Sequence, residues 1–529
     1  MYGHGSVNGD DPWWQAAKAQ QRLRNTSERM KASQLKQIQK GQADLLDLLI
    51  VGSGFSGLCL ALQMQRAGKR WHLVEQAASL GGTWRDNHYP GAACDIPSNL
   101  YSISFMPNPE WTRLFPPQAE IEAYMNRCAD QGGIRPGLQF NARVVRALWD
   151  ETVMCWRVTL ADGSELRARA LALGTGGLSR PRMPQIEGLE RFEGTLFHSA
   201  RWRHDVALAG KKVGVIGTGA SAIQIVPAIA AQCGSLTLFQ RTPAWIVPRQ
   251  DKAVSAETQA LYRRRPWRQR LNRALTYARL ESRMFAFRSA PWLLKLAQSQ
   301  VLKFIAAKVR DPVLRQQLTP DYKIGCKRIL LSDDFYRALR QPNVHLVNQG
   351  VVRATERGVI TADGQEHQLD VLVAATGFLV TDAGAPFEVI GRDGVDLNQV
   401  WSAGPQAYLG TTVAGFPNLF VMTGPNTGSG HNSIIYIIEA QARFVLKALQ
   451  AMDRAGVAAF EPRADVQQRY NADLQKRLAG SVWNAGGCSS WYLAADGSNR
   501  VLWPDYTFRL RRSLSSFDWQ AFHAIGATA

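Results

Sequence analysis

The sequence predicts an α/β protein with two dinucleotide-binding, Rossmann-like domains and a helical insertion in the second. The main observation is a pair of glycine loops, at residues 46–57 and 213–222. Each has an apolar run, then G-x-G-x-x-G or G-x-G-x-x-A, then a helical pattern. The first glycine makes a tight turn, the second lets backbone approach a pyrophosphate, and the small third residue lets the helix pack on the strand. Two such loops indicate a chain that binds two dinucleotides.

A second observation separates the two loops: the charged residue that ends the next strand. About 20 residues beyond the first glycine, the first unit has Glu75 and the second has Arg241. A carboxylate there accepts hydrogen bonds from a ribose 2′-hydroxyl, whereas a guanidinium binds a 2′-phosphate. The first site should therefore take FAD or NAD, and the second NADP. The predicted cofactor-binding residues are Gly52, Gly54, Gly57 and Glu75, then Gly217, Gly219, Ser221, Arg241 and Thr242.

The third observation is the order of patterns along the chain. Alternation over 140–173, with an Asp162-Gly163 turn and a strand at 168–173, predicts hairpins and the return of the first domain. Residues 370–378 read as a buried strand of that same domain. We therefore expect the first domain at 44–177 and again, with a C-terminal loop, at 360–529. The second domain should occupy 178–359, with an Arg-rich helical insertion at about 251–320; an amphipathic membrane-binding helix is the alternative there.

Composition and charge narrow the class of protein. The 529 residues are 46% hydrophobic and 20% charged, as in a globular protein of two or three domains. No apolar run is long enough for a transmembrane helix and no secretory signal is visible, so we expect a cytoplasmic protein. The 7 cysteines form no C-x-x-C pair, which predicts reduced thiols and no metal site.

The net charge of +19 is compatible with nucleic acid or an anionic membrane surface as partner. The charge is spread over several segments and no nucleic-acid module is visible, which favours solvated basic faces and an anionic cofactor. We expect a monomer without nucleic acid and leave a membrane-surface contact open. Residues 1–43 form a basic extension, interpreted as a helical arm on the main body or a contact with a membrane or partner.

Further motifs bring in a known family. They are G-G-T-W at 81–84, Y-P-G-A-A-C-D at 89–95, F-x-G-x-x-x-H-x-x-x-W at 192–202, G-C-K-R at 325–328, A-T-G at 375–377 and G-P-N-T-G at 424–428. Together with the two loops, they resemble the Baeyer–Villiger monooxygenases, which are class B flavin-dependent monooxygenases. The resemblance covers residues 44 to about 512 and assigns FAD to the first domain. The sequence departs at Arg203, where the family usually has Pro or Asp.

The resemblance implies roles for individual residues. Asp95 would pair with the catalytic Arg328, and Lys327 would be a second contact to the 2′-phosphate. Trp491 would close over the nicotinamide, with core packing as the equal alternative. In the fingerprint, His198 would couple domain movement to cofactor binding, rather than act as a general base. The other implied residues are Gly82, Thr83 and Trp84 over the flavin, Thr376, Gly377 and Asn426 at the cofactor, and Phe192, Gly194 and Trp202 of the fingerprint.

The implied reaction consumes NADPH and O2. Reduced FAD would form a flavin 4a-peroxide that attacks a small-molecule ketone and gives an ester or lactone, with Arg328 stabilising the anion. One alternative is a flavin monooxygenase that oxidises nitrogen or sulfur in small molecules. Another is a non-catalytic flavoprotein that binds a membrane or partner. The sequence identifies neither the ketone nor the regioselectivity.

Overall fold

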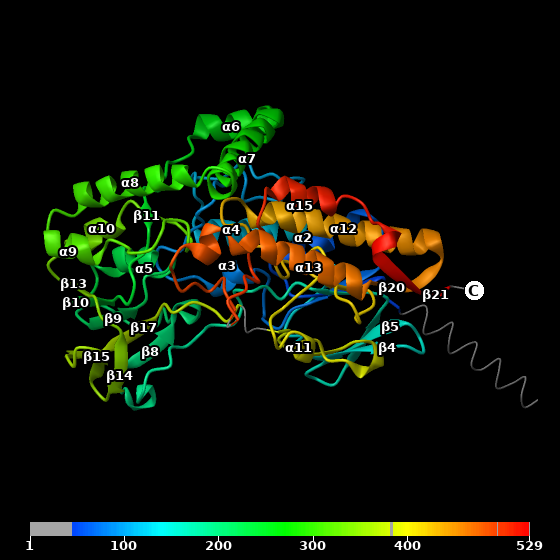
Figure 1. Cartoon of the computed structure of the whole chain (residues 1–529), viewed down its shortest axis with the longest axis horizontal. Helices are drawn as coiled ribbons and strands as arrows, with labels where there is room; N and C mark the ends of the chain where they lie inside the picture. The colour runs from blue at the N-terminus through cyan, green and yellow to red at the C-terminus, as the bar shows by residue number, and fades with distance from the viewer. Residues whose placement is uncertain (1–44, 381–383, 495, 528–529) are drawn as a thin grey trace, which may run out of the picture. The chain divides into compact units, whose positions relative to one another are not determined.

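Two parallel sheets carry the two glycine loops. The structure is a computed structural model that describes residues 45–380, 384–494 and 496–527 (Figure 1). The basic extension predicted at 1–43 lies outside these residues. We describe the unit that begins at Asp47.

The first sheet is five-stranded and parallel, and it confirms the first Rossmann-like unit. Its order is β19 (Leu419–Val421), β7 (Leu171–Leu173), β1 (Leu48–Val51), β2 (Trp71–Val74) and β3 (Leu138–Gln139). The glycine loop follows β1 and opens α2 (Phe55–Arg66). The predicted strand at 168–173 is instead two strands, because β6 (Glu165–Ala168) pairs in a hairpin sheet while β7 pairs with β1.

The second sheet is also five-stranded and parallel. Its order is β13 (Val344–Val347), β10 (Ser235–Phe239), β9 (Lys212–Ile216), β17 (Val371–Ala374) and β8 (Thr195–His198). The second loop follows β9 and leads into α5 (Ala222–Ile229). The prediction that the strand at 370–378 belongs to the first domain is wrong, because β17 lies between β9 and β8 of the second sheet. Its apolar run suits either buried sheet, so only the pairing assigns it.

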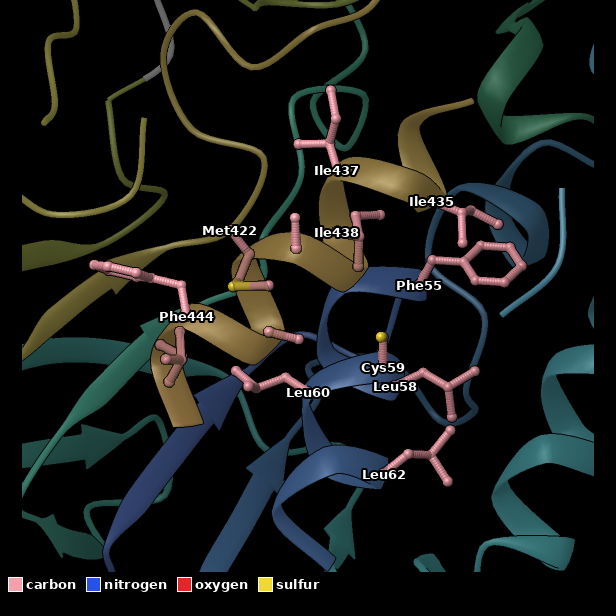
Figure 2. Packing of buried hydrophobic residues seen from close by; sticks show 14 of the residues in the cluster. Phe55, Leu58, Cys59, Leu60, Leu62, Met422, Ile435, Ile437, Ile438 and Phe444 are labelled. Atoms are coloured by element: carbon pink, nitrogen blue, oxygen red, sulfur yellow. The ribbon is translucent and has the colours of Figure 1, made fainter. Parts of the chain in front are cut away.

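Helix α2 is central to the core of the first unit. Nine of its residues, from Phe55 to Met64, are buried, as expected for a helix that is apolar all round. It packs against α12 (Ile434–Ala455), the helix predicted after G-P-N-T-G (Figure 2). Leu58 and Leu62 of α2 and Ile438 and Phe444 of α12 belong to one buried cluster. This packing fixes the helix whose N-terminus faces the first nucleotide site.

The helical insertion is present between β11 (Ile246–Val247) and β12 (Leu330–Leu331). It consists of α6 (Ala256–Arg264), α7 (Pro266–Arg288), α8 (Pro291–Lys308) and α9 (Pro312–Gln317) (green in Figure 1). None of the described helices is both long and apolar enough to cross a membrane.

Smaller elements complete the described chain. The remaining strands are β4 (Val144–Asp150) and β5 (Cys155–Leu160), which pair with β6 and β18 (Glu388–Ile390), then β14 (Val351–Thr355), β15 (Gly358–Thr361), β16 (Glu366–Gln368), β20 (Val457–Pro462) and β21 (Phe522–Ala527). The remaining α-helices are α3 (Thr83–Asp86), α4 (Gln118–Gln131), α10 (Phe335–Ala338), α11 (Leu397–Val400), α13 (Ala464–Ala479), α14 (Val482–Ala485) and α15 (Thr507–Ser513). The predicted Asp162-Gly163 turn joins β5 to β6.

Candidate active site

The first glycine loop is so closely packed that larger residues would not fit. Gly52 has φ +99°, and a Cβ there would lie 2.6 Å from the carbonyl oxygen of Gly174. A Cβ on Gly57 would lie 1.9 Å from the carbonyl oxygen of Gly52. The turn therefore requires both glycines, and it leads directly into the N-terminus of α2, the end of a helix that binds anionic groups.

Glu75 lies directly against this loop. Its Oε2 accepts hydrogen bonds from the backbone N–H of Ser53 at 2.9 Å and from the Ser53 hydroxyl at 2.8 Å. Its Oε1 accepts from the N–H of Ala77 at 3.0 Å and lies 3.4 Å from Nη1 of Arg85. The buried carboxylate is thus held at the end of β2, where the sequence predicts a contact to a ribose hydroxyl.

The G-G-T-W motif packs on the same loop. A Cβ on Gly82 would lie 2.8 Å from Cα of Gly54, so the two backbones are in close contact. Trp84 is fixed by its indole N–H, which donates to the hydroxyl of Tyr101 at 2.9 Å. Thr83 begins the short helix α3. The three residues that the resemblance places over the flavin therefore lie beside the first loop.

The second loop is tight at one end and open at the other. Gly217 has φ +114°, and a Cβ there would lie 2.5 Å from the carbonyl oxygen of Ala375 in the A-T-G segment. A Cβ on Gly219 would meet nothing within 4 Å, so space is free above the turn. The hydroxyl of Thr218 donates to the carbonyl of Thr242 at 2.7 Å and joins the loop to the end of β10. This geometry fits a pyrophosphate over Gly219.

Two cations lie close together beyond β10. Burial and the positive charge of Arg241 lower the pKa of Lys327, while Asp321 opposes the shift. The Nζ of Lys327 lies 5.0 Å from the centroid of the Tyr322 ring. Within the described chain, neither Arg241 nor Lys327 has a carboxylate at ion-pair distance. Like charges held together without a carboxylate in direct contact fit a phosphate group, so the pair suits the 2′-phosphate of NADP.

The Y-P-G-A-A-C-D loop connects the two nucleotide units. A Cβ on Gly91 would lie 2.7 Å from the carbonyl oxygen of Gln224 in α5. The Gln224 side chain accepts from the Tyr89 hydroxyl at 3.0 Å and donates to the carbonyl of Ala93 at 3.0 Å. Burial raises the pKa of Tyr89 and the Ser221 hydroxyl opposes this, which places Ser221 beside the same loop. Asp95 at the end of the loop is thereby held near the second unit.

Asp95 and Arg328 form a bidentate ion pair. Nε of Arg328 donates to Oδ2 of Asp95 at 2.8 Å, and Nη2 donates to Oδ1 at 2.8 Å. The two side chains are only partly exposed, at 28% for Asp95 and 33% for Arg328. The Asp95 charge raises the pKa of Arg328 against the effect of burial. The guanidinium is therefore a permanent, oriented positive charge with part of its surface free for a ligand.

Tyr492 lies beside this pair, and no sequence motif had pointed to it. The residue is buried, and burial raises its pKa to about 12 while Arg328 lowers it and Asp95 raises it. The neighbouring Trp491, for which the resemblance implies a contact with the nicotinamide, is 46% exposed, and its ring centroid lies 4.5 Å from that of Tyr492. The contact of Trp491 with the nicotinamide therefore stays a prediction, and Tyr492 is an additional residue beside the ion pair.

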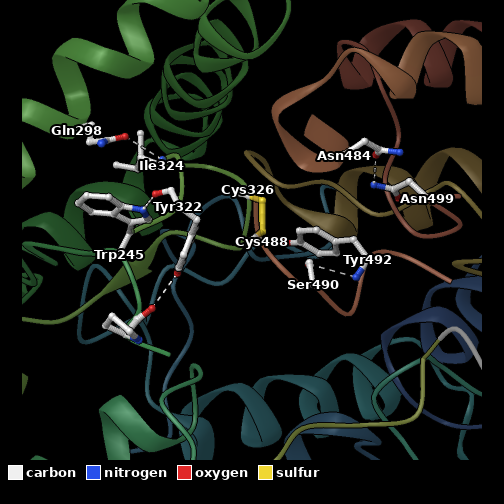
Figure 3. The surroundings of a disulfide bond; sticks show 11 residues. Trp245, Gln298, Tyr322, Ile324, Cys326, Asn484, Cys488, Ser490, Tyr492 and Asn499 are labelled. Atoms are coloured by element: carbon white, nitrogen blue, oxygen red, sulfur yellow. Dashed lines mark hydrogen bonds between the residues drawn. A yellow bond between two sulfur atoms is a disulfide. The ribbon is translucent and has the colours of Figure 1, made fainter. Parts of the chain in front are cut away.

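A disulfide bond between Cys326 and Cys488 corrects the prediction that all thiols are reduced (Figure 3). The partners are 162 residues apart in sequence, so no local spacing could reveal the pair. The bond attaches the C-terminal loop that carries Tyr492 to the residue two places before Arg328. The backbone N–H of Lys323 also donates to the carbonyl of Gly486 at 3.0 Å. The other described cysteines, Cys59, Cys94, Cys128, Cys155 and Cys233, are free and buried.

The fingerprint residues lie on β8 (Thr195–His198) and directly before and after it. His198 is buried and pairs in register with Ala374, and its Nδ1 accepts from the N–H of Ala200 at 3.1 Å. Burial lowers its pKa. Trp202 stacks edge-to-face with Phe197 at 5.1 Å, and a Cβ on Gly194 would meet the Phe192 ring at 2.3 Å.

Arg203, the departure from the fingerprint, lies at the surface. It forms an exposed ion pair with Asp205, at 2.5 Å between Nη2 and Oδ2. The substitution is thus accommodated without disturbing the Phe, Gly, His and Trp positions.

The side chains of the A-T-G and G-P-N-T-G motifs form hydrogen bonds with backbone carbonyls. Gly377 has φ +81°, and the Thr376 hydroxyl donates to the carbonyl of Arg182. The Asn426 side chain donates to the carbonyls of Asn499 at 2.8 Å and Leu502 at 3.0 Å. Asn426 therefore holds the segment that follows the C-terminal loop; its contact to a cofactor stays a prediction.

This geometry is that of an oxidoreductase that holds two dinucleotides, one at each loop. Residues 50–116 match the family described as NAD(P)-binding Rossmann-like domain, and residues 105–262 match L-lysine 6-monooxygenase/L-ornithine 5-monooxygenase. A Baeyer–Villiger monooxygenase of Pseudomonas aeruginosa is 46% identical, with 90% of each chain covered. One of Streptomyces coelicolor is 45% identical, with 90% of this chain and 92% of that protein covered.

Solved structures agree. OTEMO in complex with FAD and NADP has a TM-score of 0.81 at 29% identity, covering 90% of this chain and 99% of that chain. An oxidised steroid monooxygenase bound to NADP has a TM-score of 0.81 at 31% identity, covering 91% and 100%. The chain belongs to the family of Baeyer–Villiger monooxygenases.

Proposed function

We propose that this protein is an FAD-dependent monooxygenase that uses NADPH and O2 to insert one oxygen atom next to a ketone carbonyl, giving an ester or lactone. The observation that carries this proposal is the bidentate Asp95–Arg328 pair. The loop that contacts α5 supplies the carboxylate of Asp95, and the segment after the helical insertion supplies the guanidinium of Arg328. The tertiary fold therefore brings the pair together. Membership of the chain in the family of Baeyer–Villiger monooxygenases supports the same reaction.

The residues that would hold the cofactors follow from the two loops. Gly52, Gly54, Gly57 and Glu75 would hold FAD, whose adenosine lacks a 2′-phosphate. Gly217, Gly219, Arg241 and Lys327 would hold NADPH. When bound, the two cofactors supply hydride transfer and oxygen activation, and the protein supplies position and electrostatic field.

Arg328 would stabilise negative charge on oxygen at the reacting centre. Its N–H groups can donate to an anionic oxygen, and its guanidinium keeps its proton throughout the working pH range. Asp95 uses two acceptor atoms to fix the plane of the guanidinium, which orients the remaining N–H donors. The buried Tyr492, which lies beside the pair, would help to exclude water from it.

The two cofactors would be divided between the domains that the sequence predicts. FAD would be bound by 44–177 and by part of 360–529, and NADPH by 178–359 together with β17. We expect a cytoplasmic monomer, which size-exclusion chromatography with light scattering would test.

Substitution of Arg328 tests the assignment. Arg328→Ala should retain FAD and its anaerobic reduction by NADPH, because both cradles stay intact, while product formation falls by at least about 100-fold, as when one oxyanion donor is lost. Reduction is followed by flavin absorbance and product by gas chromatography over a ketone panel. Arg328→Lys is the matched control, since it keeps the charge and loses the bidentate fork. Ester formation at the wild-type rate in Arg328→Ala would remove the proposed role.

The match of residues 105–262 to lysine and ornithine monooxygenases favours nitrogen oxidation as the second candidate function. Parallel assays with a cyclic ketone, a primary amine and a sulfide separate the two. Turnover of the amine alone would favour the second candidate.

A further inference from the structure

We propose that the exposed face of α7 and α8 binds the surface of an anionic lipid bilayer. This proposal is independent of the catalytic one, because it rests on side chains outside both nucleotide sites and away from the Asp95–Arg328 pair.

Helix α7 exposes a stripe of large apolar side chains. Trp267 is 56% exposed, Leu271 49% and Leu275 63%. A spacing of four residues places the three on one face of the helix. Phe285, further along α7, is also exposed. A helix end with Trp and Leu directed to water is typical of a surface that another apolar phase covers.

Helix α8 also exposes large apolar side chains. Trp292, Leu296 and Leu302 are exposed on it, and α8 follows α7 after a short turn. Among the residues that the structure describes, sixteen large apolar side chains are exposed, and seven of them lie between 267 and 302. We call these seven, together with the exposed basic residues of 263–310, the α7–α8 face.

The charge of the α7–α8 face complements an anionic surface. Residues 263–310 contain thirteen basic residues and a single acid, Glu281. Glu281 is buried, so it does not offset the charge at the surface. Carboxylates at ion-pair distance are found for Arg263, Arg273 and Arg288, and within the described chain the other basic residues of the segment have none. Arg264, Arg265, Arg268 and Arg270 surround the Trp267–Leu271 part of the stripe and are exposed.

The opposite side of α7 is firmly attached, so the stripe cannot turn inward. Arg273 donates to the backbone carbonyls of Asn99, Leu100 and Ser102, at 2.9, 3.1 and 2.7 Å. The Tyr277 ring stacks on Tyr436 with 4.5 Å between centroids. Glu281 accepts from the Thr507 hydroxyl at 2.7 Å and from the side chain of Asn432. These contacts hold α7 in the orientation that leaves Trp267 and Leu271 exposed to solvent.

A bilayer surface fits this combination better than other partners. A second copy would bring an equally basic face, and each chain has a net charge of +19. Nucleic acid would match the charge and would leave the apolar stripe in water. An interfacial helix, in contrast, inserts Trp, Phe and Leu at the headgroup boundary while Arg and Lys contact anionic lipid.

Vesicle sedimentation of the full chain tests the proposal. We expect the wild-type protein to sediment with vesicles of phosphatidylcholine and phosphatidylglycerol in equal parts. With pure phosphatidylcholine or in high salt, the bound fraction should fall at least about 10-fold, as the electrostatic part is lost. Trp267→Ser/Leu271→Ser/Leu275→Ser should lose binding to the same degree, while its FAD content and NADPH oxidation stay at wild-type level.

The controls decide between the partners. Val352→Ser removes an exposed apolar side chain of the second unit outside the α7–α8 face and should bind like wild type. Arg264→Gln/Arg268→Gln keeps the stripe and should weaken binding only to the anionic vesicles. Three outcomes would overturn the proposal: no sedimentation with anionic vesicles, equal binding by the triple variant, or a lipid-free dimer that the triple variant abolishes. Binding of a DNA duplex with the same dependence on Trp267 and Leu271 would also overturn it.

Discussion

Removing the ammonium group of Lys327 should weaken the binding of NADPH and leave that of NADH nearly unchanged. Lys327 is half-buried beside Arg241, and a charged hydrogen bond from such a site contributes about 1.5–3 kcal/mol. Loss of that bond corresponds to a dissociation constant raised roughly 10- to 150-fold. Arg241 is exposed, and an exposed ion pair contributes about 0.2–1 kcal/mol, or roughly 1.5- to 5-fold. Lys327→Ala should therefore have the larger effect.

The same contact predicts a pH dependence. Because burial and Arg241 lower the pKa of Lys327, the ammonium loses its proton at a lower pH than an ordinary lysine does. The affinity for NADPH should be full below that pKa and fall as pH rises through it, whereas the affinity for NADH should stay constant. In Lys327→Ala this pH dependence should disappear.

The assay is titration of both nucleotides by protein fluorescence, from neutral to alkaline pH. Lys323→Ala is the matched control, because Lys323 is an exposed lysine of the same segment and its hydrogen bond to Gly486 uses the backbone N–H. Equal losses for NADPH and NADH in Lys327→Ala would refute the phosphate contact. An unchanged pH dependence in that variant would refute the pKa argument.

Two further predictions concern the disulfide and the glycine loops. Thiol titration in denaturant should give 5 thiols per chain without reductant and 7 after dithiothreitol, and 7 thiols without reductant would contradict the bond. The Cys488→Ser variant should unfold at a lower temperature, because the bond closes a loop of 162 residues and such a bond contributes about 2–5 kcal/mol to stability. The Gly57→Ala variant should lose FAD and be colourless, because the added Cβ would lie 1.9 Å from a carbonyl oxygen of the first loop. The Gly219→Ala variant should keep FAD and bind NADPH more weakly. A yellow Gly57→Ala protein would contradict the close packing of the first loop.

Local patterns predicted much of the fold. Both glycine loops, the strands before them and the helix after G-P-N-T-G can be read from short stretches, because apolar runs and glycines with positive φ report local backbone requirements. The sequence also distinguished Glu75 from Arg241, since each ends a strand at a fixed distance from its loop. The assignment of β17 failed for the opposite reason: a short apolar strand carries no mark of the sheet that it joins.

The sequence by itself determined the two nucleotide cradles, their different charges and the residue types at 95 and 328. Only the tertiary structure decided that the pair of Asp95 and Arg328 has two hydrogen bonds, that the buried Tyr492 lies beside it, and that Cys326 is bonded to Cys488. The physical reason is range. Turn and strand requirements act over a few residues, whereas ion pairs, burial and disulfides depend on positions that the chain brings together only when it folds.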